Sequence, residues 1–161
     1  MATDKAPIVL IHGLWMPPHS WRGWIERYTA AGHTVHAPAW PGVSELDDEL
    51  DHTKAPAEIG VGEVVDHYAA FVKTLPERPI LMGHSAGGSF VQVVMDHGYG
   101  CAGVCLNSAP TEGVRTTPWT QLHSLFPALK NPLNHHRAVG FDLEHGTYAF
   151  TNTYTPEESQ P

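Results

Sequence analysis

Short continuous apolar runs along this chain alternate with apolar residues at helical spacing. A continuous run of branched residues is typical of a strand covered on both faces of a parallel sheet. Such runs occupy residues 7–12, 79–82 and 100–106, and residues 33–39 give a weaker strand signal. Stripes at i, i+3, i+4 and i+7 predict amphipathic helices within residues 20–31, 61–75 and 86–97. This order predicts an α/β fold with a right-handed, doubly wound parallel sheet.

Local signals suggest where the first two helices begin and end. Ser20 stands where a helix N-cap is expected, and Gly32 follows the last turn of the same stripe. Pro76 is expected to end the second helix, because proline cannot donate a backbone hydrogen bond.

The pattern changes after Pro110 to short helical pieces, with no further strand. Trp119, Leu122, Leu125 and Phe126 share one helical face, which Pro127 is expected to end, and Gly146 is expected to break the chain before Tyr148 and Phe150. Thr155, Pro156 and Glu158 match the start of another helix just before the sequence stops. The prediction is a core over residues 1–110, a helical tail over 111–161, and the front part of a longer protein.

Composition narrows the function classes. The 161 residues suit one domain. The net charge of −8 argues against a nucleic-acid partner. The amino terminus lacks the features of a signal peptide, and no apolar stretch is long enough to cross a bilayer, so we expect a cytoplasmic protein without a membrane partner. Cys101 and Cys105 lie four apart in a predicted strand, too distant for a disulfide, and are expected to be buried thiols.

The strongest chemical signal is the sequence GHSAG at residues 83–87, between a predicted strand and a predicted helix. A G-x-S-x-G motif needs this context, because its serine sits on a strained turn that exposes Oγ. The flanking Gly83 and Gly87 allow close backbone approach, and the helix dipole points at the turn. We therefore expect Ser85 to be a nucleophile.

A second signal, His12-Gly13-Leu14-Trp15, follows the first predicted strand. Gly13 would let this loop fold back, so that the N–H of Leu14 joins the N–H of Ala86 in an oxyanion hole. His-Gly after a strand also occurs in ordinary turns. Trp15 is a predicted substrate-binding residue.

Through VLIHG, LMGHSAGG and the surrounding element order, the chain resembles the α/β-hydrolase family, in particular its small serine esterases and cofactor-free haloperoxidase-like members. The resemblance covers residues 6–110 and implies a three-layer α/β/α fold with a mainly parallel sheet. It implies a truncated α/β-hydrolase fold with a partial helical cap. The family's order of serine, then acid, then histidine implies that both partners of Ser85 follow later strands. This chain has no strand signal after Leu106, so the standard acid and base are expected to be missing.

Three explanations of the missing acid and base remain open. A cap histidine could reach Ser85, or a partner chain could supply the missing groups. Otherwise the chain is a fragment or a short variant with weak or no activity. The cap candidates are His123, His135, His136 and His145 as base, with Glu112, Asp142 or Glu144 as acid.

No cofactor or metal is expected. His135, His136, Asp142, Glu144 and His145 match no standard metal-site spacing. His33 and His36 are expected to be surface polar groups, and His84 is expected to pack beside the serine rather than act as the base. The glycines at 83, 87 and 88 do not form a nucleotide-binding motif.

The sequence thus predicts a carboxylesterase-like serine hydrolase of small esters, with Ser85 as nucleophile. Trp15, Trp40, Trp119 and Phe126 are candidates for an apolar acyl pocket, and core packing is the alternative for them. A haloperoxidase-type perhydrolase and a catalytically weak or silent binding or assembly module are the other candidate functions. An unpaired last strand would favour a homo-oligomer through the sheet edge, unless the helical tail covers that edge.

Overall fold

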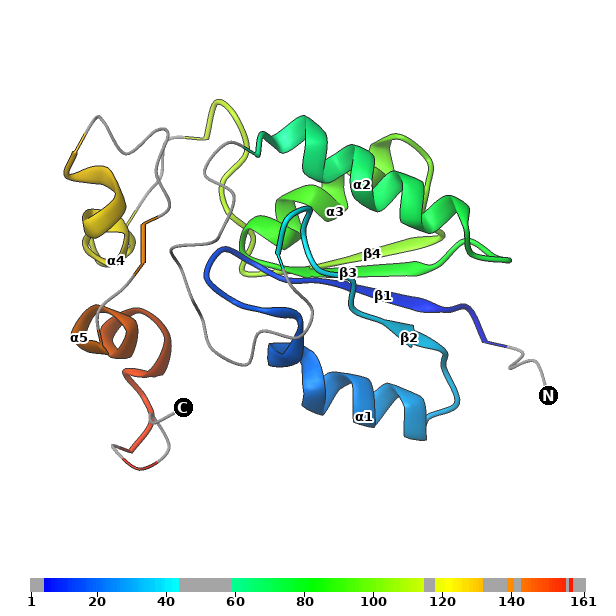
Figure 1. The fold of residues 1–161 in the computed structure, drawn as a ribbon, viewed down its shortest axis with the longest axis horizontal. Helices are drawn as coiled ribbons and strands as arrows, with labels where there is room; N and C mark the ends of the chain where they lie inside the picture. The colour runs from blue at the N-terminus through cyan, green and yellow to red at the C-terminus, as the bar shows by residue number, and fades with distance from the viewer. Residues whose placement is uncertain are drawn as a thin grey trace.

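The computed structural model describes residues 5–43, 59–114, 118–131, 139–140, 143–155 and 157 of the chain. Within them, a four-stranded parallel sheet has the order β2-β1-β3-β4. Its strands are β1 (Ile8–Ile11), β2 (Val35–His36), β3 (Ile80–His84) and β4 (Ala102–Leu106). The main helices around the sheet are α1 (Arg22–Ala30), α2 (Val61–Lys73) and α3 (Ala86–Asp96). Figure 1 shows α1 on one face of the sheet and α2 and α3 on the other, which confirms the three-layer α/β/α prediction.

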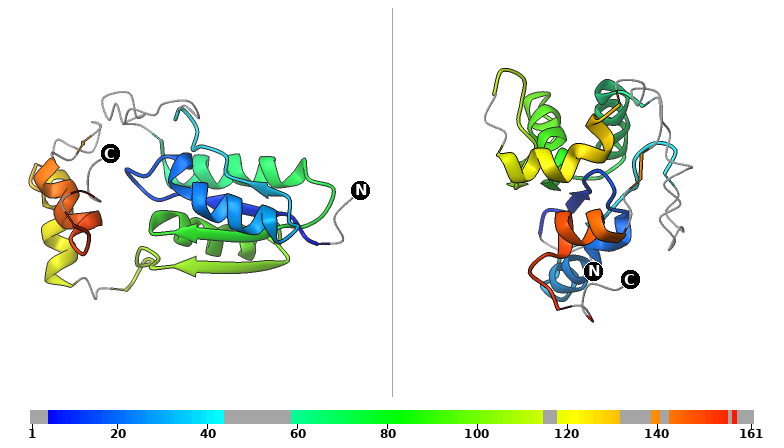
Figure 2. Two further views of the ribbon diagram at one scale, coloured as in Figure 1. Left: turned by 90° about the horizontal axis from the view of Figure 1, so that it is seen from below. Right: turned by 90° about the vertical axis from the view of Figure 1, so that its left-hand side faces the viewer.

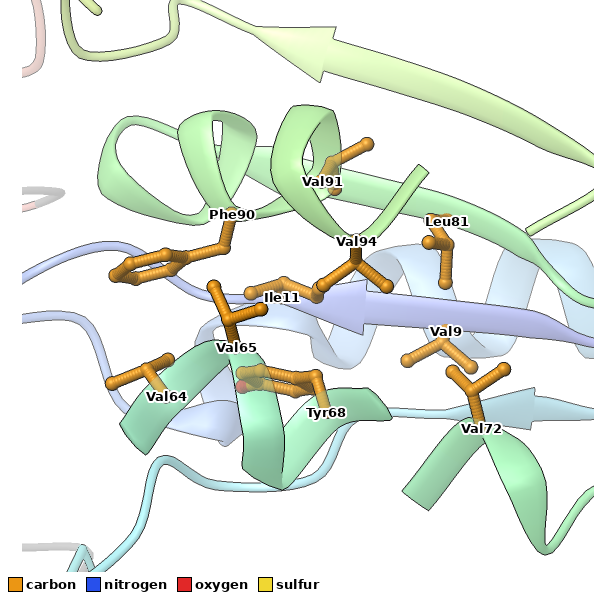
Figure 3. Close-up of a cluster of buried hydrophobic side chains, with 10 residues drawn as sticks. All are labelled: Val9, Ile11, Val64, Val65, Tyr68, Val72, Leu81, Phe90, Val91 and Val94. Carbon is orange, nitrogen blue, oxygen red and sulfur yellow. The ribbon is translucent and has the colours of Figure 1, made fainter. Parts of the chain in front are cut away.

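Successive residues of β1 point to opposite faces of the sheet and enter two different cores. Val9 and Ile11 pack with the buried side chains of α2, α3 and β3, the cluster drawn in Figure 3. Ile8 and Leu10 pack on the other face with Trp21, beside α1. All four β1 side chains are buried, and each contributes about 1.5–3 kcal/mol when removed from water. The central strand is therefore held from both sides.

Because the strands are parallel, their carboxyl ends meet at one edge of the sheet. The register pairs Ile11 with Gly83 and His84 with Leu106, so β1, β3 and β4 end side by side. The two C-terminal helices, α4 (Trp119–Leu129) and α5 (Leu143–Gly146), lie beyond this edge in both Figure 1 and Figure 2. The loops that follow the strands therefore face the C-terminal helical segment.

The starts of two predicted elements differ from the structure. Ser20 does not cap α1, because it lies inside a short 3-10 helix, η1 (Pro18–Trp21), and α1 begins only after Trp21. The second predicted strand shrinks to the two residues of β2, which pair with β1. Gly32 does follow α1 with φ +88°, as expected for a glycine that ends a helix.

Strand β4 contradicts the prediction of a buried strand. Four of its five residues are exposed, and Val104 is 37% exposed. Its only strand partner among the described residues is β3. Cys101 and Cys105 are free, as expected, but exposed rather than buried. An apolar run indicates that a strand is suited to burial. Whether the strand is buried depends on which other element covers it.

The helical breaks expected in the C-terminal part are also wrong. Helix α4 continues through Pro127 to Leu129. Proline removes only one backbone donor, and the later Lys130 N–H still bonds to the Phe126 carbonyl. Gly146 is the last residue of α5, and the chain continues directly into the π-helical turn η3 (Thr147–Thr151). The predicted helix start at Pro156 and Glu158 lies outside the described residues. The division of the chain at residue 110 stays a prediction.

No helix in the described ranges combines the length and the apolar character that crossing a membrane requires.

Candidate active site

Ser85 occupies a strained turn between β3 and α3. Its φ of 55° and ψ of −122° lie outside the regions that residues with a side chain normally adopt. Such a conformation costs on the order of 1–3 kcal/mol and persists only where the surroundings hold it. The strand-to-helix turn expected from the GHSAG motif is therefore present, with strain at the residue that the motif singles out.

Gly83 and Gly87 make the turn possible by close backbone contact. A Cβ atom on Gly83 would lie 2.2 Å from the Gly87 carbonyl oxygen, a separation that real Cβ atoms do not adopt. The end of β3 and the first turn of α3 can thus approach because Gly83 lacks a side chain. A Cβ atom on Gly87 would instead overlap the carbonyl oxygens of Ile11 and His12, so this second glycine lets α3 approach the end of β1.

Backbone hydrogen bonds from the end of β4 fix the turn. The Ser85 N–H donates to the Leu106 carbonyl at 3.0 Å, and the Ser85 carbonyl accepts from the Ala109 N–H at 3.0 Å. The Gly88 N–H also donates to the Ser85 carbonyl, at 3.0 Å. The neighbouring strand therefore holds the backbone of Ser85 on both sides of its Cα atom. Sequence analysis did not identify Leu106 or Ala109 in this role, because no local pattern signals it.

The loop after β1 passes directly over the turn. A Cβ atom on Gly13 would lie 3.0 Å from the Cβ of Ser85, so a larger residue at position 13 would press on the serine. Among the described residues, the N–H groups of Leu14 and Ala86 have no hydrogen-bond acceptor. Ala86 is the first residue of α3, where a backbone N–H has no partner within the helix. Within the part of the chain that the structure describes, both amides are thus unpaired, and their role in an oxyanion hole stays a prediction.

His12 clamps the start of this loop. Its Nε2 accepts a hydrogen bond from the Trp40 N–H at 3.2 Å, so the ring proton resides on Nδ1, which donates to the Gly13 carbonyl at 2.9 Å. The Trp40 indole N–H bonds to the His12 carbonyl at 3.2 Å, and the two rings stack with centroids 5.1 Å apart. Burial lowers the pKa of His12 to about 4, against the opposing effect of the bond to Gly13. His12 is therefore a neutral clamp whose ring nitrogens are both engaged.

Trp15 connects the far side of the loop to the C-terminal segment. Its φ is 60°, and its indole Nε1 donates to the Val139 carbonyl at 2.6 Å. This hydrogen bond does not test whether Trp15 contacts a substrate, so its substrate-binding role stays a prediction. The bond shows that its polar edge faces the chain at Val139.

The structure does not bring a base to Ser85 within the described residues, where the Ser85 Oγ has no hydrogen-bond partner. Partial burial lowers the pKa of His84, whose ring lies beside Gly13. His123 packs instead against Tyr148, with ring centroids 4.6 Å apart, and against His145 at 6.4 Å. Three other candidates, His135, His136 and Asp142, lie outside the described residues. Glu112 and Glu144 are exposed.

Four aromatic residues are candidates for an acyl pocket: Trp15, Trp40, Trp119 and Phe126. Among the described residues, no contact joins these four side chains to one another. Trp40 packs on the core, with its ring 5.2 Å from that of Phe90. Trp119 and Phe126 are 79% and 55% exposed on α4. Core packing, the alternative raised for these residues, thus describes Trp40.

No cluster of three or more histidine, cysteine, aspartate or glutamate side chains able to hold a metal occurs in the part of the chain that the structure describes. Two of the residues weighed as ligands, Glu144 and His145, belong to that part.

Comparison with known proteins supports the resemblance seen in the sequence. Residues 8–158 match the model of the alpha/beta hydrolase family. No curated protein sequence matches the chain.

Several solved structures share the fold. An extracellular alpha/beta-hydrolase from a Paenibacillus species, described as a structural and functional homologue of Tobacco Salicylic Acid Binding Protein 2, has a TM-score of 0.73 and 21% identity, over 96% of this chain and 63% of its own. A pyrethroid hydrolase from Sphingobium faniae has a TM-score of 0.68 and 21% identity, over 97% of this chain and 64% of its own. A monoacylglycerol lipase from Paleococcus ferrophilus has a TM-score of 0.53 and 26% identity, over 77% of this chain and 49% of its own. The chain therefore spans less than two thirds of these relatives. The cytoplasmic location expected for this chain stays a prediction.

Proposed function

Since this chain belongs to the alpha/beta hydrolase family, we propose that it is a serine hydrolase of carboxylic esters with Ser85 as nucleophile. The observation that carries the proposal is the backbone of Ser85, strained at φ 55° on the turn between β3 and α3. Structural strain of this kind is retained where it serves a site. Membership of the family supports the reaction class, and the strained turn supports Ser85 as the reacting residue.

The proposed reaction proceeds through an acyl-enzyme. The Ser85 Oγ attacks the ester carbonyl carbon and transfers its proton to a base, while the carbonyl oxygen becomes an oxyanion. The free amides of Leu14 and Ala86 bind that oxyanion, and the amino-terminal dipole of α3 adds to its stabilisation. Collapse of the intermediate breaks the bond to the alcohol oxygen, which takes the proton back from the base and leaves as the alcohol. Water, losing a proton to the base, then attacks the acyl-enzyme in the same way, and collapse releases the acid and returns the proton to Ser85 Oγ.

The source of the base decides the rate. A histidine of the C-terminal segment, a partner chain, or sequence beyond this chain could provide it. With an oxyanion hole and binding alone, a serine site retains roughly 10³-fold acceleration over water. We therefore propose weak turnover by this chain alone and faster turnover where a base is supplied.

Two features support a neutral, apolar ester as substrate. The net charge of −8 disfavours anionic substrates, and Leu14, beside the proposed oxyanion hole, is 45% exposed. The structural neighbours also include a pyrethroid hydrolase and a monoacylglycerol lipase. Short-chain or aryl esters are the proposed substrates.

The test is covalent labelling of the purified protein with a fluorophosphonate. Ser85 Oγ should attack phosphorus and displace fluoride, and Ser85→Ala should abolish both labelling and hydrolysis of p-nitrophenyl acetate. Ser20→Ala is the matched control, because Ser20 is an exposed serine in η1, outside the proposed site. Equal labelling of the protein and of Ser85→Ala would remove Ser85 from the mechanism.

A second candidate, a silent binding or assembly module, is supported by the lack of a partner for Ser85 Oγ among the described residues. Such a module would keep the turn as architecture. It predicts no labelling and no turnover in either the unchanged protein or Ser85→Ala. The same experiment therefore separates the two candidates.

A further inference from the structure

The loop between β1 and η1 is attached at two points that differ in character. At its start, His12 bonds to Gly13, the next residue of the loop, and to Trp40, which packs against the core. At its far side, Trp15 bonds to Val139, which is 124 positions away in the sequence and outside the core. The amide of Leu14 lies between these two attachments.

Trp15 is held in a conformation that its own sequence does not favour. A φ of 60° costs a residue with a side chain on the order of 1 kcal/mol, so surrounding contacts must maintain it. The indole N–H bond to Val139, 2.6 Å long, is one such contact. A change in this bond would let the backbone at Trp15 relax toward negative φ.

Relaxation at Trp15 would rotate the peptide plane between Leu14 and Trp15. The Leu14 N–H lies in the next plane toward the amino terminus, and it would be displaced with this rotation. An oxyanion donor acts only when its N–H points at the developing charge, within about 2.7–3.1 Å of the oxyanion. The position of Val139, close in sequence to α5, would then influence how well Leu14 can donate. The C-terminal segment and the loop after β1 are thereby connected through one side chain.

We propose that Trp15 is a positioning residue, whose indole N–H ties the backbone at Val139 to the loop carrying the Leu14 amide, so that docking of the C-terminal segment sets the geometry of the oxyanion hole. This role rests on the proposed hydrolase function. It differs from substrate contact, because it acts through the indole N–H rather than through the face of the ring.

Trp15→Phe tests the proposal, since phenylalanine keeps an aromatic ring and lacks the N–H. The expected result with p-nitrophenyl acetate is a kcat lowered about fivefold and an unchanged KM, because oxyanion donation acts in the transition state. Trp24→Phe is the control: Trp24 is a partly exposed tryptophan on α1 that packs on Trp21 and Tyr28, and its replacement should leave kcat unchanged. An unchanged kcat in Trp15→Phe, or a raised KM alone, would overturn the proposal.

Hydrogen exchange gives a second readout that does not need catalysis. Trp15→Phe should speed amide exchange in both the loop after β1 and the α5–η3 segment, with α2 unchanged. No change in either region, or a uniform increase that includes α2, would contradict the coupling. If the unchanged protein neither labels nor turns over, the hydrolase proposal fails, and the exchange experiment still decides whether Trp15 connects the two segments.

Discussion

A Cβ atom on Gly87 would lie 2.1 Å from the Ile11 carbonyl oxygen, so the first turn of α3 rests directly on the end of β1. The same hypothetical atom would lie 2.6 Å from the His12 carbonyl oxygen. Both neighbours are backbone atoms of the central strand and its loop, and neither can move without disturbing the sheet.

Gly87→Ala should therefore destabilise the protein by about 3 kcal/mol or more, because the added methyl group overlaps fixed backbone. Gly62→Ala is the matched control, since Gly62 lies in α2 with nothing within 4 Å of the added atom. That control should be neutral or stabilising by about 0.5 kcal/mol. Urea unfolding followed by circular dichroism measures both, and equal midpoints for the two variants would show that the contact is not rigid.

Ser85 substitutions should separate strain from chemistry. Ser85→Gly removes a strain of about 1–3 kcal/mol and adds a glycine entropy cost of about 0.5–1 kcal/mol, so a net gain of about 1 kcal/mol is expected. Ser85→Ala keeps the side-chain strain and should leave stability unchanged within about 0.5 kcal/mol. Both variants should lose fluorophosphonate labelling. Thermal unfolding of the three proteins in parallel provides the measurement, and a destabilised Ser85→Gly would refute the strain argument.

Burial of His12 predicts a loss of stability in mild acid. Its folded pKa of about 4 lies below the ordinary value of 6.5, so the unfolded chain binds a proton between these pH values while the folded chain does not. Stability should therefore fall as the pH drops through this window, by about 2 kcal/mol between pH 7 and pH 5 from this group alone.

His12→Asn isolates this effect from the other histidines of the chain. The variant should be less stable at pH 7, because the bonds to Gly13 and Trp40 are weakened. Its loss of stability between pH 7 and pH 5 should be smaller than that of the unchanged protein by about 2 kcal/mol. Parallel pH dependences for the two proteins, measured by urea unfolding, would contradict a neutral buried His12.

The exposed edge of β4 leads us to propose self-association of this chain. Val104→Lys introduces a charge on the edge strand and should shift the equilibrium toward monomer. Val93→Lys is the matched control, since Val93 is 38% exposed on α3 and Val104 is 37% exposed. Light scattering over a micromolar concentration series measures the shift. A clean monomer of the unchanged protein would exclude association through this edge.

The sequence predicted the elements whose signals are local. The apolar run of β1, the helical stripe of α2 and the GHSAG turn all depend on residues adjacent in the chain, and the structure places each of them close to the expected bounds. The alternation of strand and helix also predicted the parallel three-layer arrangement, because few other topologies bury such elements.

The remaining features depend on partners far away in the sequence. The clamp between His12 and Trp40 and the bond from Trp15 to Val139 join residues that no periodic pattern relates. The exposure of β4 could not be predicted from its apolar sequence, because burial is decided by the element that covers a strand. Pro127 shows the converse: a strong local signal is overridden when the rest of the helix remains bonded.

Strand β3, which leads into Ser85, lies inside the sheet, with β1 on one side and β4 on the other. Sheets fray from their borders, and here one border is the two-residue strand β2. Transient peeling of β2 would leave the three strands that frame the serine aligned. Strand β1 thus lies between this border of the sheet and the strand that leads into Ser85.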